Sequence, residues 1–232
     1  MKVSIIVPVL NEATNIKRLV KRLKEGCREN LVDLLIVDGG STDNTAALAR
    51  EAGATVLQSP VCGRAAQMNY AAKFAQGELL YFVHGDTLPP LTYMTDVLHA
   101  VQEGYPIGCF RFRFESDHPL LKVNSYMTRF DRLWCRGGDQ TLFVKREIFD
   151  ELQGYRNEFV IMEEYDFIIR ARKKYPFKII PQEVLVSARK YDQNGYFRVQ
   201  FANLVVFNMF LLGFSQEKIA GMYKKMLRYR YA

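Results

Sequence analysis

The sequence lacks the short motifs that mark several large enzyme classes. Its 232 residues contain neither G-x-G-x-x-G nor G-x-x-x-x-G-K-[ST], which argues against a dinucleotide-dependent oxidoreductase and a P-loop NTPase. Only three histidines occur and none stands in H-E-x-x-H, so a zincin metalloprotease is excluded. Residues 39–43, GGSTD, lack the final glycine of a nucleophile elbow, which argues against a serine hydrolase. None of these four enzyme classes is therefore predicted for this chain.

Cysteine is scarce and forms no motif. The four cysteines, Cys27, Cys62, Cys109 and Cys135, include no C-x-x-C pair, so neither a zinc knuckle nor a redox motif is predicted. Reduced thiols in a cytosolic protein are the simplest expectation. A secretory signal is also absent, because Pro8 soon interrupts the short apolar run at the N-terminus. We therefore expect the protein to face the cytoplasm.

One apolar run, VQFANLVVFNMFLLGF at residues 199–214, is too short to cross a bilayer, which needs roughly 20 apolar residues. It favours a helix that packs in the core, in a homo-oligomer or on a membrane surface. Basic residues follow it and suit anionic headgroups; they are Lys218, Lys224, Lys225, Arg228 and Arg230. Peripheral contact of residues 199–230 with the inner face of the membrane is thus one expectation, and oligomer or core packing is the other.

Charge points to an anionic partner. The formal net charge is +7 and the isoelectric point is about 9.2. A nucleoside diphosphate, an anionic membrane and nucleic acid all fit, as does a merely solvated basic helix face, and of these we do not expect nucleic acid. The composition, 49% hydrophobic and 25% charged, is that of a soluble globular chain large enough for one well-buried core.

The first third of the chain holds three apolar runs that each stop at a polar turn. They are VSIIVPVLNE from Val3, LLIVDGGSTD from Leu34 and LLYFVHGDT from Leu79. Runs without polar alternation are typical of parallel strands buried on both faces. Helices are predicted between them at residues 14–25, 45–52 and 64–74, with a short strand at 55–57. The pattern predicts an α/β fold, whose ligands bind beyond the carboxyl ends of the strands.

The second half of the chain has a different pattern. Residues 109–114, CFRFRF, alternate apolar and basic side chains, which predicts a strand with one solvated face and hence a mixed sheet. Helices are predicted at 91–103, 120–134 and 163–174. Short strands are predicted at 141–144, 177–180 and 184–187.

The polar residues at the three strand ends form an acidic cleft on a basic protein. They are Asn11, Glu12, Asp38, Asp43, His84 and Asp86. Clustered carboxylates are unfavourable unless a cation or hydrogen-bond donors offset them. His84 and Asp86 point the same way along an extended segment, so both could reach a divalent cation that bridges two phosphates. The alternative is that these residues shape a turn and cap the next helix.

Two further segments carry the same ambiguity. In DGGSTDNT, Ser41, Thr42 or Asp43 can cap the following helix, whereas Asp38 at the strand end could accept the N–H of a pyrimidine ring. In IMEEYDF, Glu163 and Glu164 could simply interact with a helix dipole. A carboxylate there could instead remove a proton from an attacking hydroxyl.

Taken together, PVLNE, VDGGSTDNT, GRAAQMN, HGDT, GDQTLFVKR and MEEYDF resemble family 2 of the GT-A glycosyltransferases. The resemblance covers most of the chain up to about residue 189. In particular, the chain is similar to the small bacterial branch associated with radical-SAM and selenium-domain proteins.

The resemblance implies a nucleotide-binding role for five residues. Pro8, Asn11 and Glu12 match positions that hold the ribose and uracil, Asp38 matches a carboxylate that meets the base, and Arg64 matches a basic residue that contacts the nucleotide.

The resemblance also implies a metal site that uses Mg²⁺ or Mn²⁺. Asp86 matches the last acid of the family's D-x-D motif, and His84 stands where its first acid is expected. That departure either weakens the metal site or shifts more of the neutralisation of the diphosphate to Arg64, Arg189 or Lys190.

Catalytic and sugar-contacting roles follow in the same way. Glu163 and Glu164 match the family's E-D pair, whose second member is usually the base, and the choice between them stays open. Gly138, Asp139 and Gln140 match a loop near the donor sugar or acceptor, although Asp139 could equally be a turn residue with a local hydrogen bond.

The resulting expectation is an inverting transferase that moves a sugar from a nucleoside diphosphate sugar, UDP-linked by preference, to an unknown acceptor hydroxyl. The expected fold is a GT-A, Rossmann-like, mixed and mostly parallel sheet flanked by helices. We expect a transferase domain at residues 1–190, with a nucleotide-sugar half at 1–115 and an acceptor half at 116–190, and a helical extension at 191–232. The alternatives are a sugar nucleotidyltransferase and a non-catalytic nucleotide-sugar-binding protein.

Overall fold

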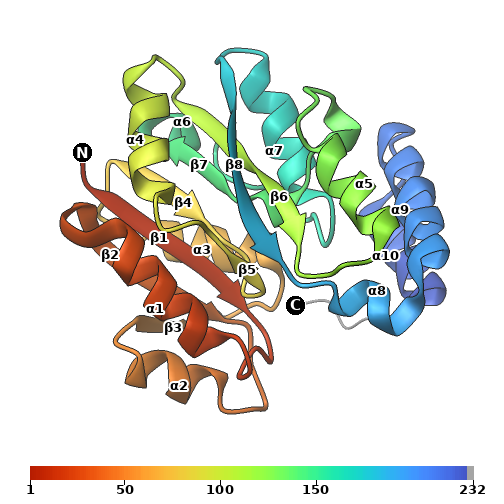
Figure 1. The fold of residues 1–232 in the computed structure, drawn as a ribbon, viewed down its shortest axis with the longest axis horizontal. Coiled ribbons are helices and arrows are strands. Elements are labelled where there is room, and N and C mark those ends of the chain that lie inside the picture. Colours follow the sequence, from red (N-terminus) through yellow and green to blue (C-terminus); the bar gives the residue numbers. More distant parts are fainter. Residues whose placement is uncertain (229–232) are drawn as a thin grey trace.

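The computed structural model describes residues 1–228, in which one mixed sheet carries helices on both faces (Figure 1). The strands are β1 Val3–Val9, β2 Leu31–Asp38, β3 Thr55–Gln58, β4 Leu79–Phe82, β5 Thr87–Leu88, β6 Ile107–Phe114, β7 Leu142–Lys145 and β8 Phe177–Val186. The α-helices are α1 Ile16–Cys27, α2 Thr45–Glu51, α3 Arg64–Ala72, α4 Tyr93–Gln102, α5 Pro119–Met127, α6 Arg146–Glu151, α7 Glu163–Arg172, α8 Arg189–Asn194, α9 Tyr196–Leu211 and α10 Gln216–Met226. Short 3-10 turns are η1 Arg28–Asn30, η2 Leu133–Cys135 and η3 Gly138–Gln140.

The strand order is β3-β2-β1-β4-β7-β6-β8-β5. Strands β3, β2, β1 and β4 run parallel, and helices make the crossovers that parallel neighbours need. Strand β7 is antiparallel to both β4 and β6, while β8 is parallel to β6 and antiparallel to β5. The predicted mixed, mostly parallel sheet is confirmed.

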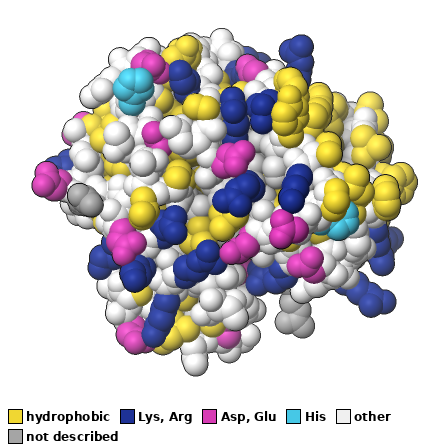
Figure 2. Space-filling view, viewed as in Figure 1, with side chains coloured by type: hydrophobic (Ala, Val, Ile, Leu, Met, Phe, Trp, Pro, Cys, Tyr) yellow, Lys and Arg dark blue, Asp and Glu magenta, His cyan; other side chains and the backbone are white. Residues whose placement is uncertain are grey.

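Three helices form the C-terminal extension. Helices α9 and α10 pack on each other beside α5, at the side of the molecule where the hydrophobic side chains of Figure 2 gather. Their shared core is small and includes Val199, Ala202, Val206 and Ile219. Within residues 1–228 no helix combines the length and apolar character that a membrane crossing needs. Arg230, one of the basic residues noted in the sequence, lies outside the described residues.

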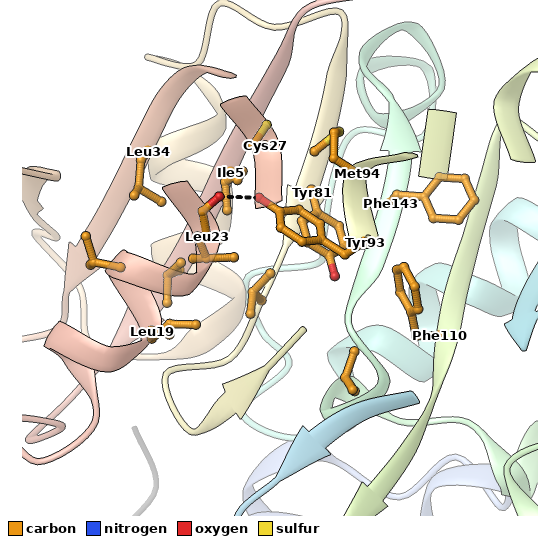
Figure 3. Packing of buried hydrophobic residues seen from close by; sticks show 14 of the residues in the cluster. Ile5, Leu19, Leu23, Cys27, Leu34, Tyr81, Tyr93, Met94, Phe110 and Phe143 are labelled. Carbon is orange, nitrogen blue, oxygen red and sulfur yellow. Dashed lines mark hydrogen bonds between the residues drawn. The ribbon is translucent and has the colours of Figure 1, made fainter. Parts of the chain in front are cut away.

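Alternation along the central strands divides the core into two layers. Ile5 of β1 faces the layer that contains α1 and α4, whereas Ile6 faces the layer that contains α3, α6 and α7. Figure 3 shows the first layer, where the Tyr93 hydroxyl donates a 2.6 Å hydrogen bond to the carbonyl of Leu23. The ring of Tyr93 also stacks on Tyr81 at 5.2 Å between centroids. The four cysteines are free.

The helix predicted at residues 120–134 is wrong in its second half, because α5 ends at Met127. The guanidinium of Arg136 donates to the carbonyls of Thr128 and Phe130 at 2.5 and 2.7 Å. A side chain from further along the chain thus binds the carbonyls that a longer helix would have used internally.

The two strands predicted at 177–180 and 184–187 are one strand, β8. Its register against β6 shifts between Phe110 and Arg111, opposite the step from Ile180 to Glu183. Pro181 lies in this bulge, where a residue without an N–H is tolerated. The bulge interrupts the apolar pattern without ending the strand.

Candidate active site

The carboxyl ends of β1 and β2 are tied together by their polar turns. The Asn11 N–H donates to the Ser41 hydroxyl at 2.9 Å, and the Asn11 side chain accepts from the Thr42 N–H at 2.8 Å. Asp38 accepts from both the N–H and the hydroxyl of Ser41, and from Gln58 at 3.2 Å. Asn11 has a φ of +57°, a left-handed conformation that asparagine tolerates. Asn11 and Asp38, two of the residues predicted to bind the nucleotide, therefore hold these turns in place.

Glu12 links the turn after β1 to the start of α8. One carboxylate oxygen accepts from Arg189 at 2.6 Å, the other accepts from Asn15 at 2.7 Å, and its N–H donates to the Thr45 hydroxyl at 2.8 Å. Glu12 is 9% exposed. The predicted nucleotide residue Glu12 and the predicted diphosphate residue Arg189 thus form an ion pair at the strand ends, between the start of α8 and the turn after β1.

His84 lies between two carboxylates. Its Nε2 is 2.8 Å from Glu164 Oε1, and its Nδ1 is 3.6 Å from Asp139 Oδ1. Burial opposes a positive charge on His84, but the nearby carboxylate of Asp139 and the hydrogen bond to Glu164 outweigh it and raise its pKa to about 10. Burial likewise opposes ionisation of Glu164, yet the charge of Arg64 and the His84 hydrogen bond hold its pKa at about 2. The geometry thus favours an imidazolium between two ionised carboxylates.

Glu163 occupies a different position from Glu164. It is fully buried, and Arg64 Nε lies 2.8 Å from its Oε1. Burial and the neighbouring Glu164 raise the pKa of Glu163 to about 8, against the pull of Arg64. Glu164 lines the cavity described below, whereas Glu163 does not. The structure thereby distinguishes two acids that the sequence could not rank.

Gly138 makes the close approach of η3 to this cluster possible. A Cβ at Gly138 would lie 2.2 Å from His84 Cε1 and 2.3 Å from Glu164 Oε1. The predicted role of Gly138 near donor sugar or acceptor stays a prediction. Its observed role is to leave room for the His84–Glu164 pair.

Asp86 is the residue best placed to bind a cation. Burial and the nearby carboxylates of Asp139 and Glu12 raise its pKa, so a positive ion would relieve unfavourable charge there. Within residues 1–228 no group of three or more His, Cys, Asp and Glu side chains is arranged to hold a metal ion by itself. Mg²⁺ commonly binds through one or two carboxylates together with substrate phosphates and water. Asp86 fits that mode.

His84 fits a metal less well. A metal-bound histidine offers a nitrogen lone pair. Both ring nitrogens of His84 instead face carboxylates, and its raised pKa favours the doubly protonated ring. Its predicted role as a ligand stays a prediction, and the pairing with Glu164 indicates a positioning role.

A cavity of about 450 Å³ brings most of the predicted residues together. Its polar end is lined by Pro8, Glu12, Arg64, His84, Asp86, Gly138, Asp139, Glu164 and Lys190. Five other predicted residues are not among those that line the cavity, namely Asn11, Asp38, Gln140, Glu163 and Arg189. The cavity continues to a largely apolar side, lined by Phe112, Phe114, Met127, Trp134, Leu204 and Phe207.

Several residues of the site were missed in the sequence. Gln67 is fully buried and donates to the carbonyls of Val9 and Val37 at 3.1 and 2.6 Å, which fastens the ends of β1 and β2. Its place within GRAAQMN was the available signal. Gln200 and Asn203 line the cavity from α9, and their polarity within an apolar run could have indicated this. Nothing in the sequence pointed to Arg136.

Comparison with known proteins identifies the family of the chain. The sequence model described as Glycosyl transferase family 2 matches residues 4–160. A 4-deoxy-4-formamido-L-arabinose transferase acting with undecaprenyl phosphate, from Proteus mirabilis, is 26% identical over 220 residues. The match covers 88% of this chain and 65% of that protein. Glycosyltransferase AglJ from Haloferax volcanii is 31% identical over 159 residues, 66% of this chain and 49% of that protein. The chain thus spans between half and two thirds of the length of these relatives.

Solved structures support the fold. A mannosyltransferase from Pyrobaculum calidifontis, in complex with GDP-Man and Mn²⁺, superposes with a TM-score of 0.70 at 20% identity, over 88% of this chain and 62% of that one. TarS 1-349 of S. aureus, in complex with UDP-GlcNAc, gives 0.68 at 15% identity, over 97% and 71%. The segment that the family model matches contains β1 to β7 with their polar ends, and the fold is similar to that of these two transferase structures. On these grounds the chain belongs to glycosyl transferase family 2.

Proposed function

We propose that the protein is an inverting glycosyltransferase that moves a sugar from a nucleoside diphosphate sugar, UDP-linked by preference, to an acceptor hydroxyl. The observation that carries the proposal is the position of Glu164, a carboxylate that lines the cavity next to Asp86 and Arg64. Its low pKa keeps it ionised at neutral pH, which is the state that a general base needs. Its hydrogen bond to His84 weakens it as a base, so proton transfer to Glu164 requires the acceptor hydroxyl to take the place of this contact.

The reaction balances with the groups at hand. The acceptor oxygen attacks the anomeric carbon, its proton passes to Glu164, and the bond from that carbon to the diphosphate oxygen breaks with its electron pair on the diphosphate. Arg64 and Lys190 line the same end of the cavity and offset the charge of the leaving group. A divalent cation held by Asp86 would supply further neutralisation. Attack from the face opposite the leaving group inverts the configuration.

The matched pair Glu164→Gln and Glu158→Gln tests this assignment, because Glu158 is an exposed carboxylate outside the cavity. We expect Glu164→Gln to lose at least about 10²-fold in donor hydrolysis or transfer, and Glu158→Gln to keep the wild-type rate. Nucleotide binding is measured separately, as the rise in melting temperature with UDP, GDP or dTDP, with and without Mn²⁺.

Two results would separate the alternatives. If UDP with Mn²⁺ raises the melting temperature but no sugar nucleotide is ever cleaved, the protein is a nucleotide-sugar-binding protein. Release of pyrophosphate from a nucleoside triphosphate would identify a nucleotidyltransferase. Preference for GDP or dTDP would overturn the UDP assignment and leave the fold untouched.

Other expectations from the sequence stay proposals. They are the radical-SAM and selenium-domain branch, the division of the chain at residues 115 and 190, the cytoplasmic location at the inner face of the membrane, and peripheral membrane or homo-oligomer contacts through residues 199–230.

A further inference from the structure

Two neighbouring segments expose a broad apolar surface, which we call the α5–α9 surface. It consists of Val123, Tyr126, Phe130 and Trp134 from α5 and the turn after it, and of Phe197, Phe201, Leu204, Leu211 and Leu212 from α9 and its end. Phe197 is 78% exposed and Leu212 is 76% exposed. The Tyr196 hydroxyl donates to Asn124 at 3.0 Å and so joins the two helices. Figure 2 shows hydrophobic side chains gathered at the side of the molecule where α5 and α9 lie in Figure 1, with charged side chains around them.

The exposed side chains follow helical spacing. Phe197, Phe201 and Leu204 stand at i, i+4 and i+7 on one face of α9. The opposite face buries the smaller Val199 and Ala202 against α10. A surface helix usually buries its largest apolar residues, whereas α9 exposes its phenylalanines. An exposed apolar face of this kind indicates contact with an apolar partner.

The charges around the surface favour a lipid bilayer over a second copy of the chain. Between residues 189 and 228 the chain carries seven basic side chains, Arg189, Lys190, Arg198, Lys218, Lys224, Lys225 and Arg228, and two acidic ones, Asp192 and Glu217. Lys122, Arg129 and Arg132 are exposed along α5 and the turn after it. The acids beside them, Asp117 and Asp131, are paired with Lys122 and Arg172. A symmetric dimer through this surface would bring two basic rims together. Anionic headgroups would instead neutralise them.

The surface is also continuous with the cavity. Trp134 and Leu204 line the cavity and are 55% and 59% exposed. The apolar side of the cavity therefore opens where the α5–α9 surface lies, while Glu164 and Asp86 mark its polar end. The α5–α9 surface and the cavity therefore share residues, which connects the surface to the site.

We propose that the α5–α9 surface docks on an anionic membrane, with the phenylalanines of α9 inserted at the acyl-chain boundary and the flanking lysines and arginines against the headgroups. Docking places the apolar side of the cavity at the lipid phase. The acceptor class that follows from this geometry is an amphiphile held in the bilayer.

The test uses Trp134, the only tryptophan of the chain. Vesicles of phosphatidylglycerol and phosphatidylcholine with brominated acyl chains quench a tryptophan that inserts among the chains. We expect quenching of Trp134 with these vesicles and much less with brominated phosphatidylcholine alone. The change Lys122→Glu with Arg129→Glu, two exposed basic residues of α5 and its end, should weaken binding to the anionic vesicles at least about fivefold.

A matched pair of double variants separates insertion from charge. Phe197→Ser with Phe201→Ser should weaken vesicle binding at least about tenfold. Val61→Ser with Leu91→Ser removes two similarly exposed apolar side chains far from the surface and should leave binding unchanged. The melting temperature and its rise with UDP are measured on every variant, so loss of folding or of the proposed nucleotide site is seen independently of membrane binding.

Three outcomes would overturn the proposal. They are the absence of quenching by anionic vesicles, equal binding of the phenylalanine double variant and wild type, and a dimer in analytical ultracentrifugation that the phenylalanine change dissociates while vesicles fail to bind.

Discussion

Gly138→Ala tests whether the close approach of η3 to the His84–Glu164 pair organises the site. The added Cβ would lie 2.2 Å from His84 Cε1 and 2.3 Å from Glu164 Oε1. Ordinary contacts between carbon atoms lie at about 3.5–4.0 Å, so the loop or the pair has to move by more than about 1 Å. Both neighbours are buried and paired with each other at 2.8 Å.

The magnitude follows from two terms. Overpacking a well-packed site costs about 1–3 kcal/mol. Loosening a charged, buried hydrogen bond costs about 1.5–3 kcal/mol. Movement of the loop or of the pair relieves the overpacking but loosens the hydrogen bond, so the two costs are not fully additive. We expect the free energy of unfolding to fall by about 2–4 kcal/mol, and the melting temperature by about 5–15 °C for a chain of this size. A displacement of the base by about 1 Å should also reduce donor cleavage about 10²-fold.

Gly137→Ala is the matched control. A Cβ at Gly137 would have only the Tyr165 hydroxyl near it, at an ordinary 3.6 Å, and its φ of 166° is extended backbone that alanine adopts freely. Melting temperature and donor cleavage are measured for both variants. The reasoning is refuted if Gly138→Ala matches wild type in both, or if Gly137→Ala is impaired as severely.

Three further predictions concern charge, strand ends and the cation. Stability should fall from about pH 6.5 toward pH 9, because folded His84, with its pKa raised from 6.5 to about 10, keeps a proton that the unfolded chain has lost. The pKa of Glu163, raised from 4.5 to about 8, lowers stability with rising pH in the same way. His84→Gln should make the melting temperature depend less on pH between pH 6.5 and pH 9. An unchanged dependence on pH would contradict the pairing of His84 with its carboxylates. Gln67→Leu removes the side-chain donor to the Val37 carbonyl and one of two donors to the Val9 carbonyl, which keeps the N–H of Gly39, and should cost about 1–3 kcal/mol in chemical denaturation, against no loss for the exposed Gln102→Leu. Asp86→Asn should abolish the extra rise in melting temperature that Mn²⁺ adds to UDP, and retention of that increment would show that the cation binds elsewhere.

The order of strands and helices in the first half was readable from the sequence. The apolar runs that end at Val9, Asp38 and Phe82 are buried on both faces, and such burial leaves a continuous hydrophobic pattern. The polar residues that follow them had to meet at one edge of a parallel sheet. The sequence misjudged α5 and β8, because the side chain of Arg136 and the bulge at Pro181 decided them, and it gave no signal for the short elements β5 and α6.

The pairing of the site residues was not readable in the same way. Glu12 meets Arg189 across 177 positions, and His84 meets Glu164 across 80. Local pattern carries no information about such contacts, because they depend on how the sheet order places β4 beside β7 and on how α7 and α8 pack over the strand ends.

The sequence by itself determined a family, a sheet and the chemical types gathered at its carboxyl edge, because strand burial and short motifs are local properties of the chain. Only the tertiary structure decided which glutamate faces the cavity, what His84 binds and where the apolar helix α9 turns its phenylalanines. Those choices depend on side chains that approach from distant segments. Burial and charge, set by the assembled fold, then determine their protonation and their role.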